Sequence, residues 1–370
     1  MKTKVQKDAL QKKLANIQSI VDRGGSLQIL NHFLLNVEKD NTFIMATDLE
    51  TAYKEPVEME IIEEGRICIH GKKFFEIIKE MEGEISLESI DGNWIKITSG
   101  KSNIRLACLP PEDFPLWPSL EGEAEIRLPK MLLLQIIERS LYAAKDTEAR
   151  FFLNGLLFRI TSDGVLTVVG TDTHRLALVK SHVELKEASI IQEKKDILIS
   201  KKALTEIKKI LTDTQEMVVI TIGKNHMLFK INEIELLTRQ IEGTFPEYEK
   251  AMPVSFEKKL SVDRNTFLKS LRKVSVISKE RGYAVKLEMD TGSMSISATD
   301  PDYGEATDEI PADYSAPPFS IAFNAKYLQE AAMTMPTERI VLNFIESSNP
   351  VMIQQEGIED YKCVIMPLRY

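Results

Sequence analysis

The sequence predicts an α+β protein built from three similar domains, because two short patterns each recur three times at nearly the same spacing. The first pattern ends in Thr-Asp and recurs at offsets of 124 and 128 residues, at Asp48, Asp172 and Asp300. The second, Lys-x-[Phe/Leu]-x-Glu, recurs at offsets of 130 and 124 residues, from Lys72, Lys202 and Lys326. Two unrelated patterns repeating in one order indicate an internal triplication. We therefore expect domains at 1–122, 123–251 and 252–370 of the 370 residues.

Each copy is predicted to open with a strand and an amphipathic helix. In the first copy we expect the helix over 8–21, with Asp8 as its N-cap, Leu10 and Leu14 on its apolar stripe, and Gly24-Gly25 ending it. The later copies place the corresponding helices over 130–144 and 263–277.

Two short β runs around a turn follow the first helix and end in Thr-Asp, as in "NGLLFRITSDGVLTVVGTD" and "AVKLEMDTGSMSISATD". The second pattern then starts another helix, expected over 72–81, 201–211 and 324–335, and alternating strands complete each copy. The repeated order predicts antiparallel sheets with two helices in each domain.

The composition, with 43% hydrophobic and 28% charged residues, is typical of a globular protein with real cores. There is no run of 18 apolar residues, and "MKTKVQKDALQKKL" lacks the apolar stretch of a secretory signal, so we expect no membrane association and a cytoplasmic location. The three cysteines, Cys68, Cys108 and Cys363, are odd in number and far apart. They fit buried free thiols in a reducing compartment better than disulfides or zinc ligands.

The net charge of −9 argues against nucleic acid as a partner, but the charges are unevenly placed. Residues 201–211 hold four basic residues and one acid, and residues 263–281 hold six basic residues and two acids. Such helices could meet phosphates without reading sequence. The alternative is an ordinary solvated helix face.

Several segments resemble a known family, the bacterial DNA polymerase III beta subunits, which are replicative sliding clamps. They are "ATDLE" (46–50), "FFLNGLLF" (151–158), "GTDTHRLAL" (170–178), "FPEYEKAMP" (245–253) and the C-terminal "VIMPLRY" (364–370). The resemblance spans the whole chain and includes its threefold repeat. It implies three DNA-clamp domains in a ring-shaped head-to-tail homodimer, with helices lining a central hole and antiparallel sheets outside.

The resemblance also implies a function, that of a DNA polymerase processivity factor. Such a clamp encircles duplex DNA without sequence specificity and tethers the polymerase through a peptide-binding cleft between domains 2 and 3. The implied partners are duplex DNA, the DNA polymerase III alpha subunit, the clamp loader, other clamp-binding-motif proteins and a second copy of the chain. No catalytic residue, metal or cofactor is implied.

Matching positions supply candidate site residues. The partner-peptide pocket would be formed by Leu153, Thr171, His174, Arg175, Leu176, Pro246, Val364, Met366, Pro367 and Leu368. The DNA contacts would be Arg23, Phe151, Phe152, Lys201, Lys202, Lys279 and Arg281. The dimer interface would pair Ile104 and Leu106 with Val276 and Ile277. Each apolar position among these could instead be ordinary core.

The chain departs from the family pattern near the expected pocket. Thr173 stands where glycine is usual before the His-Arg pair, and Glu249-Lys250 replaces a more basic pair after "FPEY". Elsewhere, Gln28 replaces a common proline, Gly24 a common arginine and Tyr370 a common aliphatic residue. These differences bear on pocket and DNA contacts rather than on the fold.

Two other functions compete with the clamp. An enzyme could use Asp172, His174 and a serine as a triad, but the sequence has no Gly-x-Ser-x-Gly, P-loop, Gly-x-Gly-x-x-Gly or metal-ligand spacing. An aspartate that recurs in all three copies suits a turn or strand end better than catalysis. The second alternative is an interaction scaffold with the same pocket that never encloses DNA.

Overall fold

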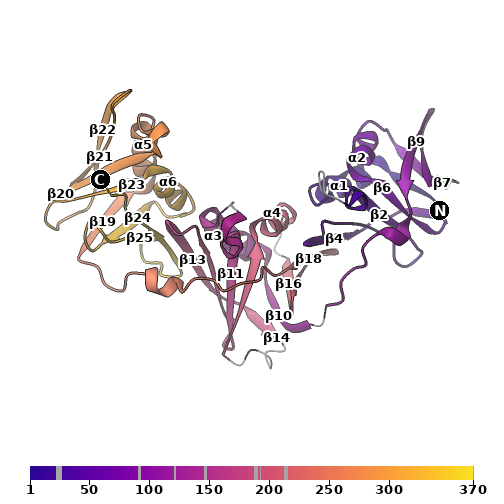
Figure 1. Cartoon of the computed structure of the whole chain (residues 1–370), viewed down its shortest axis with the longest axis horizontal. Helices are drawn as coiled ribbons and strands as arrows, with labels where there is room; N and C mark the ends of the chain where they lie inside the picture. Colours follow the sequence, from indigo (N-terminus) through magenta and orange to yellow (C-terminus); the bar gives the residue numbers. More distant parts are fainter. Residues whose placement is uncertain are drawn as a thin grey trace. The chain divides into compact units, whose positions relative to one another are not determined.

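The structure, a computed structural model shown in Figure 1, describes every residue except 22–26, 91–92, 121, 146–147, 187–190, 192, 212–215 and 370. The chain forms two compact units. The first contains Met1–Leu133, Glu184–Gln192 and Lys202–Gln240, and the second contains Leu134–Val183, Glu193–Lys201 and Ile241–Tyr370. Parts of the middle repeat belong to both units.

The three repeats have the same order of elements, except that among the described residues the third has no counterpart of β5 and β14. The first contains β1 (Lys2–Gln6), α1 (Lys7–Ile17), β2 (His32–Val37), β3 (Phe43–Thr47), β4 (Thr51–Pro56), β5 (Glu60–Glu63), β6 (Gly65–His70), α2 (Gly71–Lys79), β7 (Glu84–Ile90), β8 (Trp94–Ser99) and β9 (Ser102–Leu109). The second contains β10 (Gly122–Pro129), α3 (Lys130–Ser140), β11 (Gly155–Thr161), β12 (Val165–Thr171), β13 (Arg175–His182), β14 (Glu184–Lys186), β15 (Lys194–Ser200), α4 (Lys201–Ile210), β16 (Met217–Gly223), β17 (His226–Ile231) and β18 (Ile234–Arg239). The third contains β19 (Lys258–Asp263), α5 (Arg264–Val274), β20 (Ala284–Asp290), β21 (Ser293–Asp300), β22 (Gly304–Pro311), β23 (Phe319–Asn324), α6 (Ala325–Met333), β24 (Arg339–Phe344), β25 (Val351–Gln355) and β26 (Tyr361–Ile365).

All named strands pair antiparallel. The first unit holds one sheet in the order β14-β10-β16-β17-β18-β4-β3-β2-β6-β9-β8-β7-β1-β5. The second unit holds a sheet in the order β15-β11-β12-β13-β26-β25-β24-β19 and a four-stranded sheet in the order β22-β21-β20-β23. Helices α1 and α2 contact each other in the first unit, and α5 and α6 do so in the second, as Figure 1 shows. The structure therefore has the predicted α+β class.

The helices begin and end close to the predicted positions, with two corrections. Helix α1 ends at Ile17 rather than Val21, and its N-cap is Gln6 rather than Asp8, which lies in the first turn. The reason is that β1 runs straight into the helix, and a carboxylate in the first turn still complements the helix dipole. The predicted Gly24-Gly25 end lies outside the described residues. Helix α3 stops at Ser140, whose hydroxyl donates to the Ile136 carbonyl at 2.7 Å, and a 3-10 turn follows.

The repeated Thr-Asp forms a tight turn in every copy. The carboxylate Oδ1 of Asp48, Asp172 and Asp300 accepts hydrogen bonds from the backbone N–H groups two and three residues later, at 2.6 to 3.3 Å. Such a turn is a standard use of aspartate. The recurrence of Asp is thus explained by backbone geometry, as the sequence suggested.

The three cysteines are buried and unpaired, as predicted. Burial raises the pKa of Cys363 to about 11 and that of Cys68 and Cys108 to about 12. Over the described part of the chain, no helix is long and apolar enough to cross a membrane.

Candidate functional site

A small apolar cavity lies in the second unit, beside the second Thr-Asp turn. Its volume is about 140 Å³, and its lining consists of Thr171, Thr173, Arg175, Leu176, Pro246, Glu247, Tyr248, Ala251, Val364 and Met366. The floor comes from two paired strands, since Leu176 of β13 lies opposite Val364 of β26. One wall comes from the segment between β18 and β19, where Tyr248–Ala251 forms a short 3-10 helix.

Six of the ten residues predicted for the pocket line this cavity: Thr171, Arg175, Leu176, Pro246, Val364 and Met366. Leu153 is fully buried in the hydrophobic cluster beneath, together with Leu176 and Val364. The side chain of His174 is exposed, and its carbonyl accepts a hydrogen bond from the Met366 N–H at 2.8 Å.

Pro367 and Leu368 lie beyond the cavity lining. The N–H of Leu368 donates to the Ala322 carbonyl at 2.8 Å, which anchors the end of the chain on β23. Leu153, His174, Pro367 and Leu368 therefore do not line this cavity, and their predicted role in binding a partner peptide stays a prediction. Each is within one or two residues of a lining position or packs beneath the lining.

Four lining residues escaped the sequence prediction: Thr173, Glu247, Tyr248 and Ala251. Thr173 has a backbone φ of +78°, a left-handed conformation that threonine adopts at a cost. The sequence did carry a signal for Thr173, because it stands where glycine is usual in the family. Tyr248 is the last residue of "FPEY", and burial raises its pKa to about 12. Glu247 and Ala251 carried no signal beyond their proximity to Pro246.

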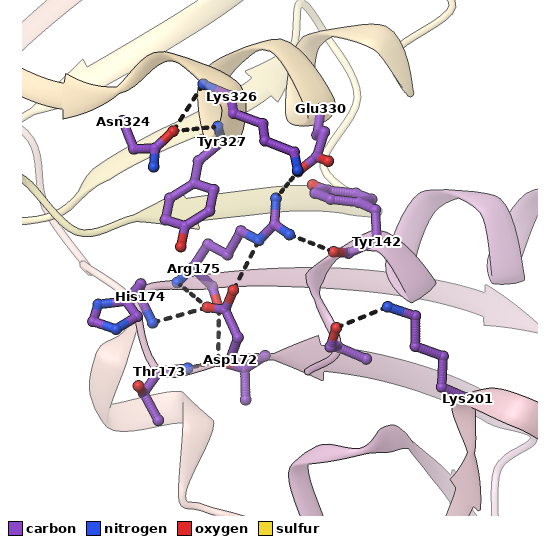
Figure 2. Close-up of polar contacts among 12 residues, drawn as sticks. Tyr142, Asp172, Thr173, His174, Arg175, Lys201, Asn324, Lys326, Tyr327 and Glu330 are labelled. Carbon is purple, nitrogen blue, oxygen red and sulfur yellow. Dashed lines mark hydrogen bonds and ion pairs between the residues drawn. The ribbon is translucent and has the colours of Figure 1, made fainter. Parts of the chain in front are cut away.

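Arg175 is the polar hub beside the cavity (Figure 2). Its guanidinium donates to Asp172 at 3.1 Å, to the Tyr142 carbonyl at 2.6 Å and to Glu330 of α6. It also lies over the rings of Tyr327 and Tyr142, at 4.4 and 5.3 Å from their centroids. These contacts join the second Thr-Asp turn to a helix of the third repeat.

The charge of Arg175 is fixed by its neighbours. Burial by itself would lower the pKa of Arg175, but the hydrogen bond and charge of Glu330 and the charge of Asp172 raise it. The guanidinium is paired with two carboxylates, so its positive charge is compensated at this side of the cavity. The floor can then receive an apolar group without burying an uncompensated cation.

The arrangement suits binding rather than chemistry. A cavity of about 140 Å³ has the size of one large apolar side chain or ring. The cavity has an apolar floor and a rim that carries hydroxyl groups. Pockets of this kind bind the few side chains that contribute most of a peptide's affinity. Among the described residues, no group of three His, Cys, Asp or Glu side chains is placed to hold a metal ion.

Comparison with known proteins gives the same family over all three repeats. The N-terminal, central and C-terminal domain models of the DNA polymerase III beta subunit match residues 1–118, 127–247 and 249–369. The chain belongs to the DNA polymerase III beta subunit family.

Relatives and solved structures of this family are similar along their full length. The beta sliding clamp of Pseudomonas putida is 29% identical over 367 residues, which cover 99% of each chain. The sliding clamp of Bacillus subtilis has a TM-score of 0.95 at 26% identity and covers 100% of this chain and 99% of its own. A Bartonella birtlesii DnaN sliding clamp bound to griselimycin has a TM-score of 0.94 at 29% identity, with both chains fully covered.

The residues predicted to touch DNA occupy several environments. Lys202 and Arg281, both more than half exposed, pair with Asp48 and with Asp300 (3.2 Å), two of the three turn aspartates. Lys201 is half-buried and donates to the Ala144 carbonyl at 3.2 Å, while Lys279 is exposed. The pairs matter because a phosphate would have to compete with a carboxylate for each of these two cations.

Phe151, Phe152 and Arg23 complete the predicted DNA set. Phe151 is 65% exposed, whereas Phe152 packs against the hydrophobic cluster below the cavity. Both lie in the 3-10 helix Glu148–Leu153. Arg23 lies outside the described residues.

The predicted dimer residues lie on two separate elements. Ile104 and Leu106 are half-buried on β9, whereas Val276 is 69% exposed and Ile277 half-buried just after α5. Ile104 and Leu106 are two residues apart on β9 and so share one face of that strand, and the predicted contact with Val276 and Ile277 of a second copy stays a prediction.

Proposed function

We propose that this protein is a DNA sliding clamp that raises polymerase processivity. It would encircle duplex DNA without reading its sequence and hold the DNA polymerase III alpha subunit, the clamp loader and other clamp-binding proteins through short peptides. The observation that carries the proposal is the cavity built by the second Thr-Asp turn, the linker between β18 and β19, and the chain at the end of β26. Six of its ten lining residues are ones that the family resemblance selected. Its domains would be 1–122, 123–251 and 252–370.

The cavity would bind one large apolar side chain of a partner peptide. Leu176 and Val364 would form its floor, and Arg175 would hold the turn that forms its edge. A terminally blocked peptide with adjacent large apolar residues should bind the wild type, and Leu176→Asp should abolish binding because it places a charge on an apolar floor. Equal binding by Leu176→Asp would refute this location.

The joints inside the chain support a ring of two copies. The strand after the first and the strand after the second Thr-Asp turn each pair with the last strand of the following repeat: β4 with β18, and β13 with β26. Strand β22, which follows the third turn, pairs with β21 and ends its sheet among the described strands. The counterpart it lacks would be β9 of a second copy, whose residues 102–107 pair on one side with β8 in the described structure. Unpaired strand edges of this kind favour association.

The repeat also predicts the register of that pairing. Three equivalent contacts align the last strands: Leu109 with Cys68, Ile241 with Leu198, and Leu368 with Ala322. Three residues earlier stand Leu106, Thr238 and Ile365. Thr238 faces Thr51, and Ile365 faces Arg175. Thr51 and Arg175 each lie three residues after the aspartate of their turn. The equivalent residue after the third turn is Tyr303, so Leu106 would face Tyr303 of the second copy.

The ring can be tested with cysteines at these two positions. Leu106→Cys combined with Tyr303→Cys should give a disulfide between copies on oxidation, because facing strand residues have the required Cα separation. Each single variant is the control and should stay uncrosslinked, since the native cysteines are buried. Light scattering should give about 84 kDa, twice the 42.0 kDa chain. A mass near that of one chain together with no crosslink would refute the ring.

Encirclement of DNA has its own test. A ring loaded on closed circular DNA should stay bound and should slide off after the circle is cut, whereas a surface binder ignores ends. Charge reversal at Lys201, Lys202 and Arg281 should weaken retention on circles, because these cations would lie near phosphates. Retention that is equal on circular and linear DNA would instead favour an interaction scaffold that never encloses DNA.

We further propose that the protein works by binding and not by catalysis. Both carboxylate oxygens of Asp172, the aspartate of the rejected triad, are engaged: one by the turn and one by Arg175. Turnover of any substrate that Asp172→Asn abolishes would contradict this. The buried free thiols fit a cytoplasmic protein.

A further inference from the structure

Arg159 joins the sheet of the second unit to the linker that walls the cavity. It lies on β11 directly opposite Asp196 of β15, and its guanidinium makes a two-pronged contact with that carboxylate at 2.7 and 2.8 Å. The planar fork of arginine matches a carboxylate in this geometry. The side chain is only 17% exposed, so Asp196 and the strand fix its direction.

The third guanidinium nitrogen of Arg159, Nη1, contacts the linker. It donates to the Tyr248 hydroxyl at 3.1 Å and to the carboxylate of Glu249, and the guanidinium lies 5.2 Å from the centre of the Tyr248 ring. Tyr248 and Glu249 open the 3-10 helix Tyr248–Ala251. One arginine therefore holds this helix to the sheet by a hydroxyl, a carboxylate and a ring face together.

The held helix is part of the cavity. Four of the ten lining residues, Pro246, Glu247, Tyr248 and Ala251, come from the linker. Glu249 is absent from the lining, and its side chain is 55% exposed. It can influence a bound peptide through the position of the wall rather than by direct contact.

A wall held in place before binding raises affinity, because the ligand need not order the segment itself. We propose that Arg159 and Glu249 are positioning residues that preset the linker wall, so that partner-peptide affinity depends on an ion pair outside the cavity. The inference rests on the proposed peptide-binding function. It also explains how Glu249, placed where a more basic pair is usual, serves this chain: it supplies the second carboxylate that Arg159 grips.

The ion pair should make the affinity for a peptide depend on salt concentration, even when the peptide itself carries no charge. Asp196 and Glu249 are 42% and 55% exposed, so mobile ions reach both carboxylates. Between about 0.1 M and about 1 M salt the Debye length falls from about 10 Å to about 3 Å, which weakens such pairs. Salt should therefore loosen the wall and lower peptide affinity in the wild type more than in a variant without Glu249.

The experiment measures binding of a terminally blocked, uncharged hexapeptide with two leucines and a phenylalanine, by fluorescence anisotropy with a neutral dye, at both salt concentrations. The variants are Glu249→Ala and Glu249→Gln. The matched control is Glu257→Gln, on the same linker, whose exposed carboxylate pairs with Lys258 instead. Thermal melting of each variant checks the fold and should agree with the wild type, since Glu249 lies largely in solvent.

At low salt we expect Glu249→Ala to weaken binding about 5-fold, which is ~1 kcal/mol at 1.4 kcal/mol per tenfold. At high salt the difference should shrink toward zero, while Glu257→Gln follows the wild type throughout. Glu249→Gln should lie between wild type and alanine, because it keeps a hydrogen-bond acceptor without the charge.

The two possible failures are distinguishable. A wild type that does not bind the peptide refutes the proposed pocket function. A wild type that binds, with Glu249→Ala equal to it in affinity or in salt response, refutes the positioning role and leaves the pocket function in place.

Discussion

Replacing Arg175 should loosen the joint between the second Thr-Asp turn and α6 while leaving the first unit unchanged. The Arg175→Met variant keeps the apolar stem but removes the cation that Asp172 and Glu330 share. Arg175 and Asp172 are 10% and 12% exposed, and Glu330 is 24% exposed. Breaking a buried pair from one side costs about 3–5 kcal/mol, and the partial exposure of Glu330 places this case near ~3 kcal/mol.

Hydrogen exchange of the backbone amides is the suitable assay, because it reports local opening free energies within a multidomain chain. A loss of ~3 kcal/mol corresponds to protection about 100-fold lower at β13 and β26. Amides of β17, in the first unit, should keep their protection. Arg339→Met is the matched control in the second unit, since Arg339 is 39% exposed and its pairs are worth less than ~1 kcal/mol. Unchanged exchange at β13 and β26 in Arg175→Met would refute the idea that Arg175 stabilises this joint.

Three further outcomes follow from other parts of the structure. Thr173→Gly should raise the free energy of unfolding by ~0.5–1 kcal/mol in urea titrations, because glycine accepts a φ of +78° without strain; a lower stability would contradict that. Asp48→Asn keeps the acceptor of the turn but frees Lys202, so it should strengthen DNA retention and steepen its logarithmic salt dependence by up to about 0.9; an unchanged slope would show that Lys202 does not meet phosphate. The buried thiols have raised pKa values in the folded state, about 11 for Cys363 and about 12 for Cys68. Their contribution to stability is therefore complete below pH 9 and is lost as pH rises from there through 11 to 12. The urea midpoint of Cys363→Ala should fall less steeply than that of the wild type over this range, and an equal fall would contradict the argument.

Much of the fold follows from patterns that the sequence displays locally. The three Thr-Asp turns and the helices that begin at the Lys-x-[Phe/Leu]-x-Glu pattern were predictable because hydrogen bonds within a few residues define them. The end of α1 was not, because it ends at Ile17 although the apolar periodicity continues to Val21. Periodicity records which face is buried, and a buried face continues past the last helical hydrogen bond.

The cavity was predictable at the positions that the family resemblance matches, Pro246 of the linker included, but not at the other linker positions. Arg175 and Val364 were matched position by position, whereas Glu247 and Ala251 line the cavity because of how the chain turns at the start and end of the 3-10 helix Tyr248–Ala251. The partners of Arg159 are 37 and 90 positions away along the chain. No short-range pattern encodes a contact at that separation.

The three turn aspartates also record how the repeats diverged after duplication. In each copy Oδ1 does the same work for the backbone, so that role was inherited unchanged. The cation at Oδ2 has a different origin each time: Lys202 comes from the following repeat, Arg175 from the turn itself, and Arg281 from earlier in the same repeat. One oxygen of the residue thus makes the same backbone contacts in all three copies, while the partner of the other oxygen differs from copy to copy.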